Sequence, residues 1–232
     1  MIKANCRDRF TAADFEFVAH TLSQTERDSV SLVELLTDAE ARDAILDHPR
    51  LVEAILATGA TLRISPQFYF YVLIRHVLKR SGLNDRGVSD YVASLLETFS
   101  QTARMRSPAD GRETTLQYIS DMLVALQGAS PVQSFLIRAH VGNYSLFLSG
   151  LFRSTVESRC QRGGPELAYY EGVGRTNFRV AASHHVARSC ALTSIYETLS
   201  DSFREVRIAL NELSDSLLHL DESASPNYAL LG

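Results

Sequence analysis

The chain has 232 residues, of which 45% are hydrophobic and 22% are charged, and its formal net charge at pH 7 is −4. These values are those of an ordinary globular protein and exclude a disordered or collagen-like chain. Only two residues are lysines, and a mildly acidic chain is a poor candidate for coating nucleic acid, because such binding needs many basic contacts to phosphates. The length fits a single helical domain spanning residues 1–232.

The sequence gives no sign of export or of metal binding. Its amino-terminal residues lack the apolar core of a secretory signal, and its three cysteines include no C-x-x-C pair. We therefore expect a cytoplasmic protein with no metal and no cofactor. Residues 131–152 have the length of a membrane span, but Arg138 and His140 would be costly near the centre of a bilayer. We expect two core helices there and no membrane contact.

Helix-start and helix-stop residues recur along the chain, whereas strand signals are nearly absent. Ser65 and Ser130 are each followed by a proline, the combination that favours the first turn of a helix. Gly82 and Gly142 follow at the positions expected for helix ends. We predict an all-α fold, a multi-helix bundle of about eight or nine helices.

Residues 65–79, SPQFYFYVLIRHVLK, contain four consecutive aromatic side chains, which point in directions about 100° apart on a helix. A helix that is apolar all round is buried, so this segment is predicted to be the central helix of the bundle. Aromatic rings with polar ends also suit a pocket for a small ligand. The candidate pocket residues are Tyr69, Tyr71, His76, Tyr169 and Tyr170, although core packing is the favoured interpretation of these side chains.

Two segments between predicted helices concentrate proline, glycine and arginine, residues 104–114 and 159–167. The first is the only candidate boundary for a sub-division of the domain. The second places Cys160 between arginines, which would lower the pKa of a reactive thiol, but an incidental loop cysteine is the default interpretation. Around it, residues 150–190 hold six arginines against three glutamates.

The last third of the chain has the clearest helical pattern. From Arg175 to Ala224 there is no glycine or proline, and the apolar residues follow in steps of three and four. One stutter, between Leu199 and Phe203, interrupts the pattern. We predict a long C-terminal helix over about residues 176–221, with two helices meeting near Ser189 as the alternative, and a flexible tail over 222–232. Its apolar stripe is predicted to be buried, either inside the chain or against a second copy. The stripe is the candidate interface of a homo-oligomer, formed by Leu199, Phe203, Val206, Leu210, Leu213 and Leu217.

The segment FRVAASHHVARSC, residues 178–190, carries two histidines between two arginines. Arg179 and His184 have the R-x4-H spacing that resembles the active-site motif of HEPN-type ribonucleases, an all-helical family. The resemblance implies that His184 acts as acid or base on the RNA 2′-hydroxyl while Arg179 binds the phosphate, in a dimer that pairs two motifs. The small residues around the histidines favour a close helix junction instead.

These patterns together predict a non-enzymatic helical interaction or regulatory module that self-associates through its C-terminal helix. A protein partner is compatible with this prediction, whereas nucleic acid and membrane are not expected as partners. The first alternative is a HEPN-like, RNA-cleaving ribonuclease that uses Arg179 and His184. The second alternative is a helical sensor that binds a small ligand.

Overall fold

The computed structural model describes residues 1–58, 63–105 and 115–218. Within these ranges the chain forms thirteen α-helices and no strand, which confirms the all-α prediction. The number of helices exceeds the eight or nine that we expected, because several segments are divided into helices of only five to ten residues. The domain boundary proposed near 104–114 lies largely outside the described residues, as does the tail predicted over 222–232.

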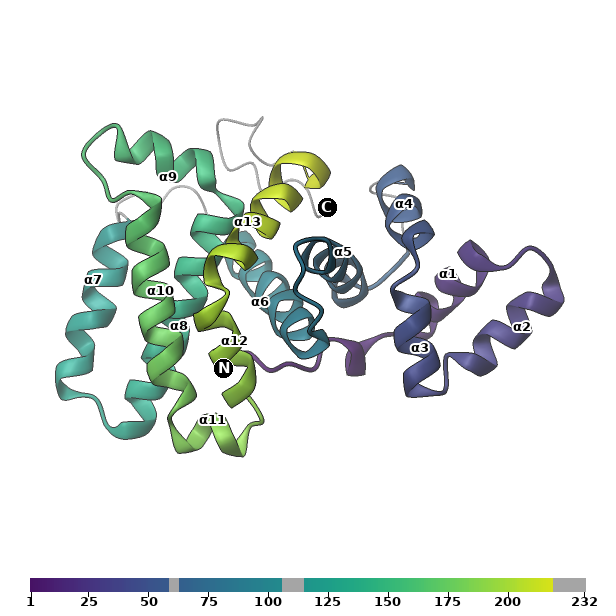
Figure 1. The fold of residues 1–232 in the computed structure, drawn as a ribbon, viewed down its shortest axis with the longest axis horizontal. Helices are drawn as coiled ribbons and strands as arrows, with labels where there is room; N and C mark the ends of the chain where they lie inside the picture. The colour runs from purple at the N-terminus through teal and green to yellow at the C-terminus, as the bar shows by residue number, and fades with distance from the viewer. Residues whose placement is uncertain (59–62, 106–114, 219–232) are drawn as a thin grey trace.

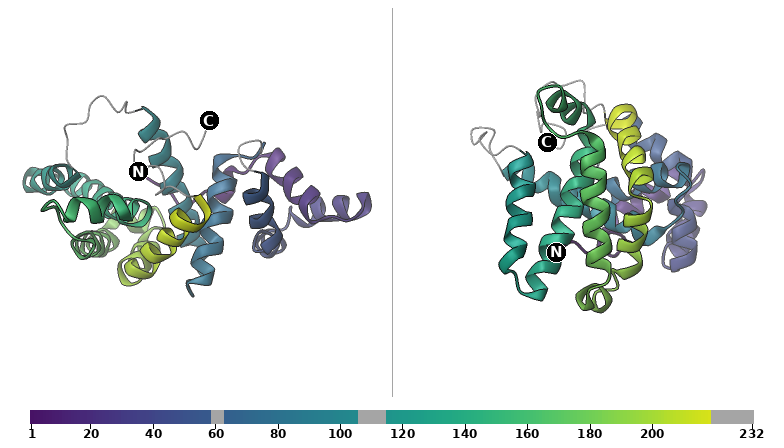
Figure 2. Two further views of the ribbon diagram at one scale, coloured as in Figure 1. Left: turned by 90° about the horizontal axis from the view of Figure 1, so that it is seen from above. Right: turned by 60° about the vertical axis from the view of Figure 1, so that its left-hand side comes forward.

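The helices are arranged along the long axis of the molecule in three groups (Figures 1 and 2). At one end, α1–α4 form a projecting group that we call the N-terminal arm. The middle is formed by α5 and α6, and the other end by α7–α12, while α13 packs on α8 and α5. The helices are α1 (Ala12–Leu22), α2 (Glu26–Leu35), α3 (Ala39–Leu46), α4 (Pro49–Thr58), α5 (Pro66–Arg80), α6 (Arg86–Met105), α7 (Thr115–Ala125), α8 (Pro131–Leu151), α9 (Arg153–Cys160), α10 (Leu167–Ala182), α11 (His185–Ser189), α12 (Thr193–Asp201) and α13 (Phe203–Glu212), with 3₁₀ turns η1 (Arg7–Arg9) and η4 (Leu126–Gly128) and a π-helical turn η5 (Leu213–Leu218).

Side-chain caps explain where the helices of the arm begin. Thr11 and Asp14 form a capping box at the start of α1, and Asp38 caps α3. The Asp14 carboxylate also accepts hydrogen bonds from the backbone N–H of Ser65 at 2.6 Å and from its hydroxyl at 2.7 Å. Ser65 is itself the N-cap of α5. A single buried carboxylate therefore fixes the start of the arm to the start of the central helix.

The central position predicted for residues 65–79 is confirmed by their burial. Helix α5 begins after Ser65 with Pro66 in its first turn, and the consecutive residues Tyr71, Val72 and Leu73, which point about 100° apart, are at most 1% exposed. Its neighbours include η1, α4, α6 and α13, from both halves of the chain. Since α5 contacts the arm on one side and the C-terminal helices on the other, it joins the two ends of the molecule.

Gly142 does not end a helix, contrary to our prediction. It lies inside α8, which runs without interruption from Pro131 to Leu151, so the two expected helices are one. A Cβ atom on Gly142 would lie 2.9 Å from the ring of Phe178 on α10, closer than ordinary contact. The glycine is therefore needed for the close approach of two helices.

Among the described residues, no helix combines the length and the apolar character needed to cross a membrane.

The long C-terminal helix predicted over 176–221 is not present as a continuous helix. The segment turns at His184, whose ring nitrogen Nδ1 accepts a hydrogen bond from the N–H of Val186 and so caps α11. It turns again at Ala191, which has a left-handed φ of 54°, and a third time at Ser202. The last turn coincides with the stutter after Leu199. Histidine capping and a left-handed alanine leave no glycine or proline signal in a sequence, so the pattern alone predicted one helix or, as the alternative, two helices meeting near Ser189, where α11 ends.

The apolar stripe of this segment is buried inside its own chain. Leu199, Phe203 and Leu210 have no exposed surface. Tyr196 on α12 reaches α6, where its hydroxyl lies 3.3 Å from that of Tyr91. The predicted burial of the stripe is therefore confirmed for the described side chains, which include Val206 and Leu213 but not Leu217. Self-association through these residues stays a prediction.

Candidate functional site

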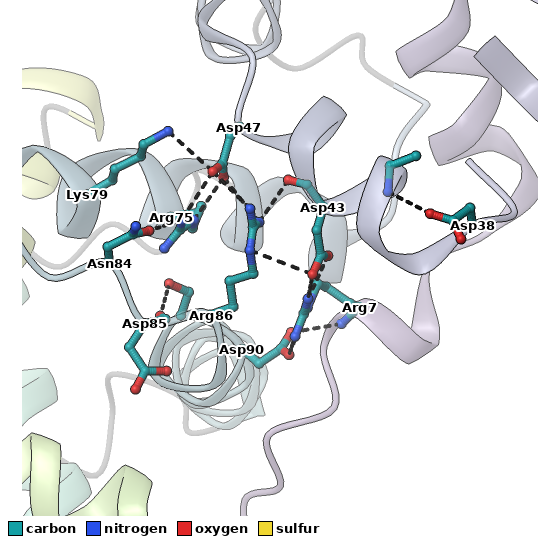
Figure 3. Close-up of polar contacts among 12 residues, drawn as sticks. Arg7, Asp38, Asp43, Asp47, Arg75, Lys79, Asn84, Asp85, Arg86 and Asp90 are labelled. Atoms are coloured by element: carbon teal, nitrogen blue, oxygen red, sulfur yellow. Dashed lines mark hydrogen bonds and ion pairs between the residues drawn. The ribbon is translucent and has the colours of Figure 1, made fainter. Parts of the chain in front are cut away.

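The N-terminal arm meets α5 and α6 at a cluster of charged side chains, which we call the junction (Figure 3). Its members come from four segments, η1, α3, α5 and α6. Helix α3 and η1 supply groups from the amino-terminal end of the chain, and α5 and α6 supply groups from the central pair. The junction consists of Arg7, Asp43, Asp47, Arg75, Lys79, Arg86 and Asp90.

Asp47, at the carboxyl end of α3, lies at the centre of the junction (Figure 3). Its carboxylate accepts hydrogen bonds from Arg75 Nε at 2.8 Å and Nη2 at 3.1 Å. Arg86 donates through Nη2 at 3.1 Å and Nη1 at 3.3 Å, and Lys79 donates through Nζ at 3.2 Å. The Asp47 side chain is only 12% exposed. Three cations on α5 and α6 thus surround one carboxylate from the arm.

Arg7 holds the other side of the junction. Its Nη1 donates to both oxygens of Asp43 at 2.6 and 2.7 Å, and its Nε donates to Asp90 at 2.9 Å. Arg86 Nη1 donates to the backbone carbonyl of Asp43 at 2.8 Å. The Arg7 guanidinium also lies over the ring of Tyr71, 5.6 Å from the ring centroid. Asp43 is therefore shared between cations from two different segments.

Two buried donors have no hydrogen-bond acceptor within the described parts of the chain: Arg75 Nη1 in the junction and the hydroxyl of Tyr71, whose ring lies against Arg7. The Arg75 side chain is 2% exposed, and its Nη2 also donates to the side-chain oxygen of Asn84. Burial raises the pKa of Tyr71 to about 12, against smaller lowering effects of Arg7 and Arg86, so the hydroxyl keeps its proton at neutral pH. Tyr71 and Arg75 are one turn apart on α5, which places both donors on the same side of the helix.

The charges of the junction are unequal, since four cations face three carboxylates and leave a formal charge of +1. Burial alone would raise the pKa of Asp47, but hydrogen bonding and charge from Arg75 and the charge of Arg86 prevail and lower it. For Asp90 the balance is reversed, because burial raises its pKa more than Arg7 lowers it. Guanidinium groups with spare donors and excess positive charge are suited to binding oxyanions.

The lowered pKa of Asp47 predicts an acid-sensitive contribution to stability. A carboxylate whose pKa in the folded state lies below its ordinary value of 3.8 stabilises the fold above that pH and loses the effect as the pH falls through the folded-state value. We expect the difference in unfolding free energy between the wild type and Asp47→Asn to be constant near neutral pH and to shrink below about pH 4. Urea denaturation across this range measures it, and a constant difference down to about pH 2–3 would contradict the lowered pKa.

The structure separates the tyrosines that the sequence suggested as pocket residues. Tyr71 lies against Arg7 of the junction, whereas Tyr69 is half-buried and packs edge-on against Phe70, 5.4 Å between ring centroids. Tyr169 and Tyr170 pack against each other in a smaller core formed by helices at the other end of the molecule. His76 is half-buried on α5, where burial, and then the charge of nearby Arg80, lower its pKa. The five residues do not form one site.

Arg179 and His184 each have a local partner. Arg179 Nη2 donates to Asp201 at 2.9 Å, in a pair that is mostly exposed. His184 stacks on Phe135 at 5.3 Å between ring centroids, and its Nδ1 is used in the cap of α11. These contacts are those of closely packed helices, as the small residues around the histidines indicated. A ribonuclease role of Arg179 and His184 stays a prediction. Cys160 is exposed at the end of α9.

Two exposed helix faces at opposite ends of the molecule have complementary character. On α2, Val30 and Val33 are 63% and 47% exposed, and the exposed Glu34 and Arg27 each lie one turn from Val30. On α10, Arg179 is exposed beside Val180, which is 41% exposed. We call these the acidic face and the basic face. The arm that carries the acidic face, residues 12–58, has ten carboxylates against three arginines.

We did not predict the junction from the sequence, because its members lie up to 83 residues apart. A local signal was nevertheless present. Asp43 and Asp47 are like charges four residues apart, an arrangement that weakens an isolated helix and therefore indicates cations from elsewhere. Arg75 with Lys79 has the same spacing and the opposite charge. The two pairs identify complementary helix faces, but only the fold brings them together.

Within the three described stretches, no group of three or more histidine, cysteine, aspartate or glutamate side chains is placed to hold a metal ion. No protein-family model, curated protein or solved structure matches this chain. The junction and the two exposed faces are therefore the features from which a function can be inferred.

Proposed function

We propose that this chain is a non-enzymatic helical interaction module that self-associates through its acidic and basic faces, the arm of each copy binding α10 of the other. The observation that carries the proposal is the exposure of Val30 and Val33 on an acidic helix. Exposed apolar side chains rimmed by charge are typical of protein interaction sites. The cytoplasmic location predicted from the sequence belongs to the same proposal.

The C-terminal stripe is a weaker candidate for the interface than these two faces. Leu199, Phe203 and Leu210 are covered by helices of the same chain, so a second copy reaches them only if the fold opens. The acidic and basic faces are not covered by any part of the chain that the structure describes. Their charges differ in sign, and each includes at least one exposed valine, so the pairing satisfies both the electrostatic and the apolar requirements of an interface.

The two faces pair only between copies, because α2 and α10 lie at opposite ends of the same molecule (Figures 1 and 2). Two copies side by side in opposite directions bring each arm to the partner's α10. Such an arrangement has twofold symmetry, so both contacts form at once and the assembly closes as a dimer. The ion pair between Arg179 and Asp201 is no obstacle, since exposed pairs contribute little and exchange readily.

Charge reversal tests the proposed pairing. Glu34→Arg and Arg179→Glu each introduce repulsion at both contacts of the dimer, so each variant alone is expected to be monomeric by light scattering where the wild type is dimeric. Mixed in equal amounts, the two variants restore attraction at both contacts of a mixed dimer. Recovery of the dimer mass in the mixture therefore identifies the two faces as partners.

Matched reversals away from the two faces provide the control. Glu53 on the arm and Arg188 on α11 are also exposed, and reversing their charges is expected to leave the dimer unchanged. A wild type that stays monomeric at every concentration overturns the proposal. So does a mixture of the face variants that fails to regain the dimer mass.

A further inference from the structure

The surroundings of Asp47 have the chemistry of an oxyanion-binding site whose ligand belongs to the chain itself. Arg75, Lys79 and Arg86 direct five hydrogen bonds at one carboxylate. Arginine forks and a lysine ammonium are the groups that proteins use to bind phosphate as well as carboxylate. We call these three side chains the cation cage. Nothing in the cage is specific to an aspartate, and any oxyanion of suitable size competes for the same donors.

The unmet donors beside the cage indicate an anion with more oxygens than a carboxylate has. Asp47 has two oxygens, and both are used by the cage. Arg75 Nη1 and the Tyr71 hydroxyl, both buried, have no acceptor among the residues that the structure describes. Each such group costs about 1–3 kcal/mol. A tetrahedral phosphate presents four oxygens, two more than a carboxylate, and so has acceptors left for further donors beside the cage.

We propose that the cation cage of Arg75, Lys79 and Arg86 is a binding site for a phosphate-class anion, which competes with Asp47 and releases the end of α3 when it binds. Lys79 is half exposed, which gives an anion a first contact at the surface before it reaches the buried guanidinium of Arg75.

The proposal is independent of self-association, because the cage and the two exposed faces share no residue. Its consequence is regulatory. Asp47 is the carboxyl-terminal cap of α3, and Asp43 one turn earlier is bound to Arg7 and Arg86. An anion that displaces Asp47 therefore weakens the attachment of the arm on the side of α5 and α6, while Arg7 still holds Asp43.

Inorganic phosphate is the probe, titrated into the full-length protein by calorimetry at constant ionic strength with chloride as the balancing anion. The wild type is expected to bind phosphate weakly. Asp47→Ala empties the cage of its internal competitor, so phosphate is expected to bind about tenfold more tightly or better. In the wild type, phosphate is also expected to speed the exchange of the α3 amide hydrogens with solvent.

Two neighbouring cations give a matched control in the wild-type background, where folding is not in doubt. Lys79 is part of the cage, whereas Arg80 is 63% exposed and pairs with Glu212. Lys79→Gln is expected to weaken phosphate binding several-fold, and Arg80→Gln, with the same change in net charge, is expected to leave it unchanged. Equal effects of the two substitutions mean non-specific charge attraction and overturn the proposal.

Three other results also contradict it. The first is phosphate binding that does not differ from chloride binding in either the wild type or Asp47→Ala. The second is equal affinity in these two proteins, which shows that Asp47 does not compete. The third is tight binding with no change in exchange at α3, which places the anion elsewhere. If Asp47→Ala does not fold, the Lys79 and Arg80 comparison and the exchange measurement still decide the question.

Discussion

Gly174→Ala is expected to destabilise the protein by about 3 kcal/mol, the upper end of the usual cost of overpacking a core. A Cβ atom at Gly174 would lie 2.3 Å from Cε2 of Phe203, a distance that no real contact permits. Phe203 has no exposed surface and packs near Phe178, so its ring cannot move away without disturbing the core. Denaturant unfolding followed by circular dichroism measures the loss.

The same helix provides the control. Gly172 is two residues away on α10 and is exposed, and a Cβ atom added to it would meet no other atom within 4 Å. Gly172→Ala is therefore expected to stabilise the protein by about 0.5–1 kcal/mol, the ordinary gain from replacing a helical glycine. The double substitution Gly174→Ala with Phe203→Leu is expected to lose less than Gly174→Ala alone. Equal effects of the two glycine substitutions would show that the ring contact is not limiting.

Arg75→Met is expected to cost about 3 kcal/mol, because it removes one partner of a buried ion pair and leaves the other poorly compensated. Methionine keeps much of the apolar stem of arginine, so the loss reports the guanidinium rather than a cavity. Asp47 retains Arg86 and Lys79, which keeps the cost at the lower end of the range for buried pairs.

An exposed ion pair serves as the comparison for Arg75. Arg153 and Glu157 are four residues apart on α9, and both side chains are about half exposed. Arg153→Met is expected to cost less than about 0.5 kcal/mol, since such pairs are largely screened by water. Comparable losses for the two arginines in urea unfolding would mean that burial of the junction contributes nothing to its stability.

The parts of the fold that the sequence predicted are those set by local chemistry. Ser65 and Ser130 begin helices because their side chains accept hydrogen bonds from the first turn, an effect contained within four residues. Gly82 follows the end of α5 with a φ of 84°, as the stop signal predicted. The buried C-terminal stripe was equally visible, because apolar spacing reports which side of a helix faces the core.

The parts that were missed depend on residues distant in sequence. In the sequence alone, Gly142 looks like the end of a helix. Its contact with Phe178, on another helix, explains why a small residue is needed there. His184 begins α11 through a side-chain cap, and Ala191 follows the end of that helix with a left-handed backbone, and helix propensities predict neither. The junction likewise requires Arg7 to meet Asp90 across 83 residues. Tertiary contacts, rather than local preference, decide these positions.

The turns at His184, Ala191 and Ser202 also bear on how quickly the chain folds. Because the C-terminal segment folds back, its side chains meet early parts of the chain, as when Tyr196 contacts Tyr91 across 105 residues. Most helical bundles fold rapidly since their contacts are local, whereas each long-range contact requires a large loop to close first. We therefore expect this all-helical protein to fold more slowly than a bundle whose contacts are all local.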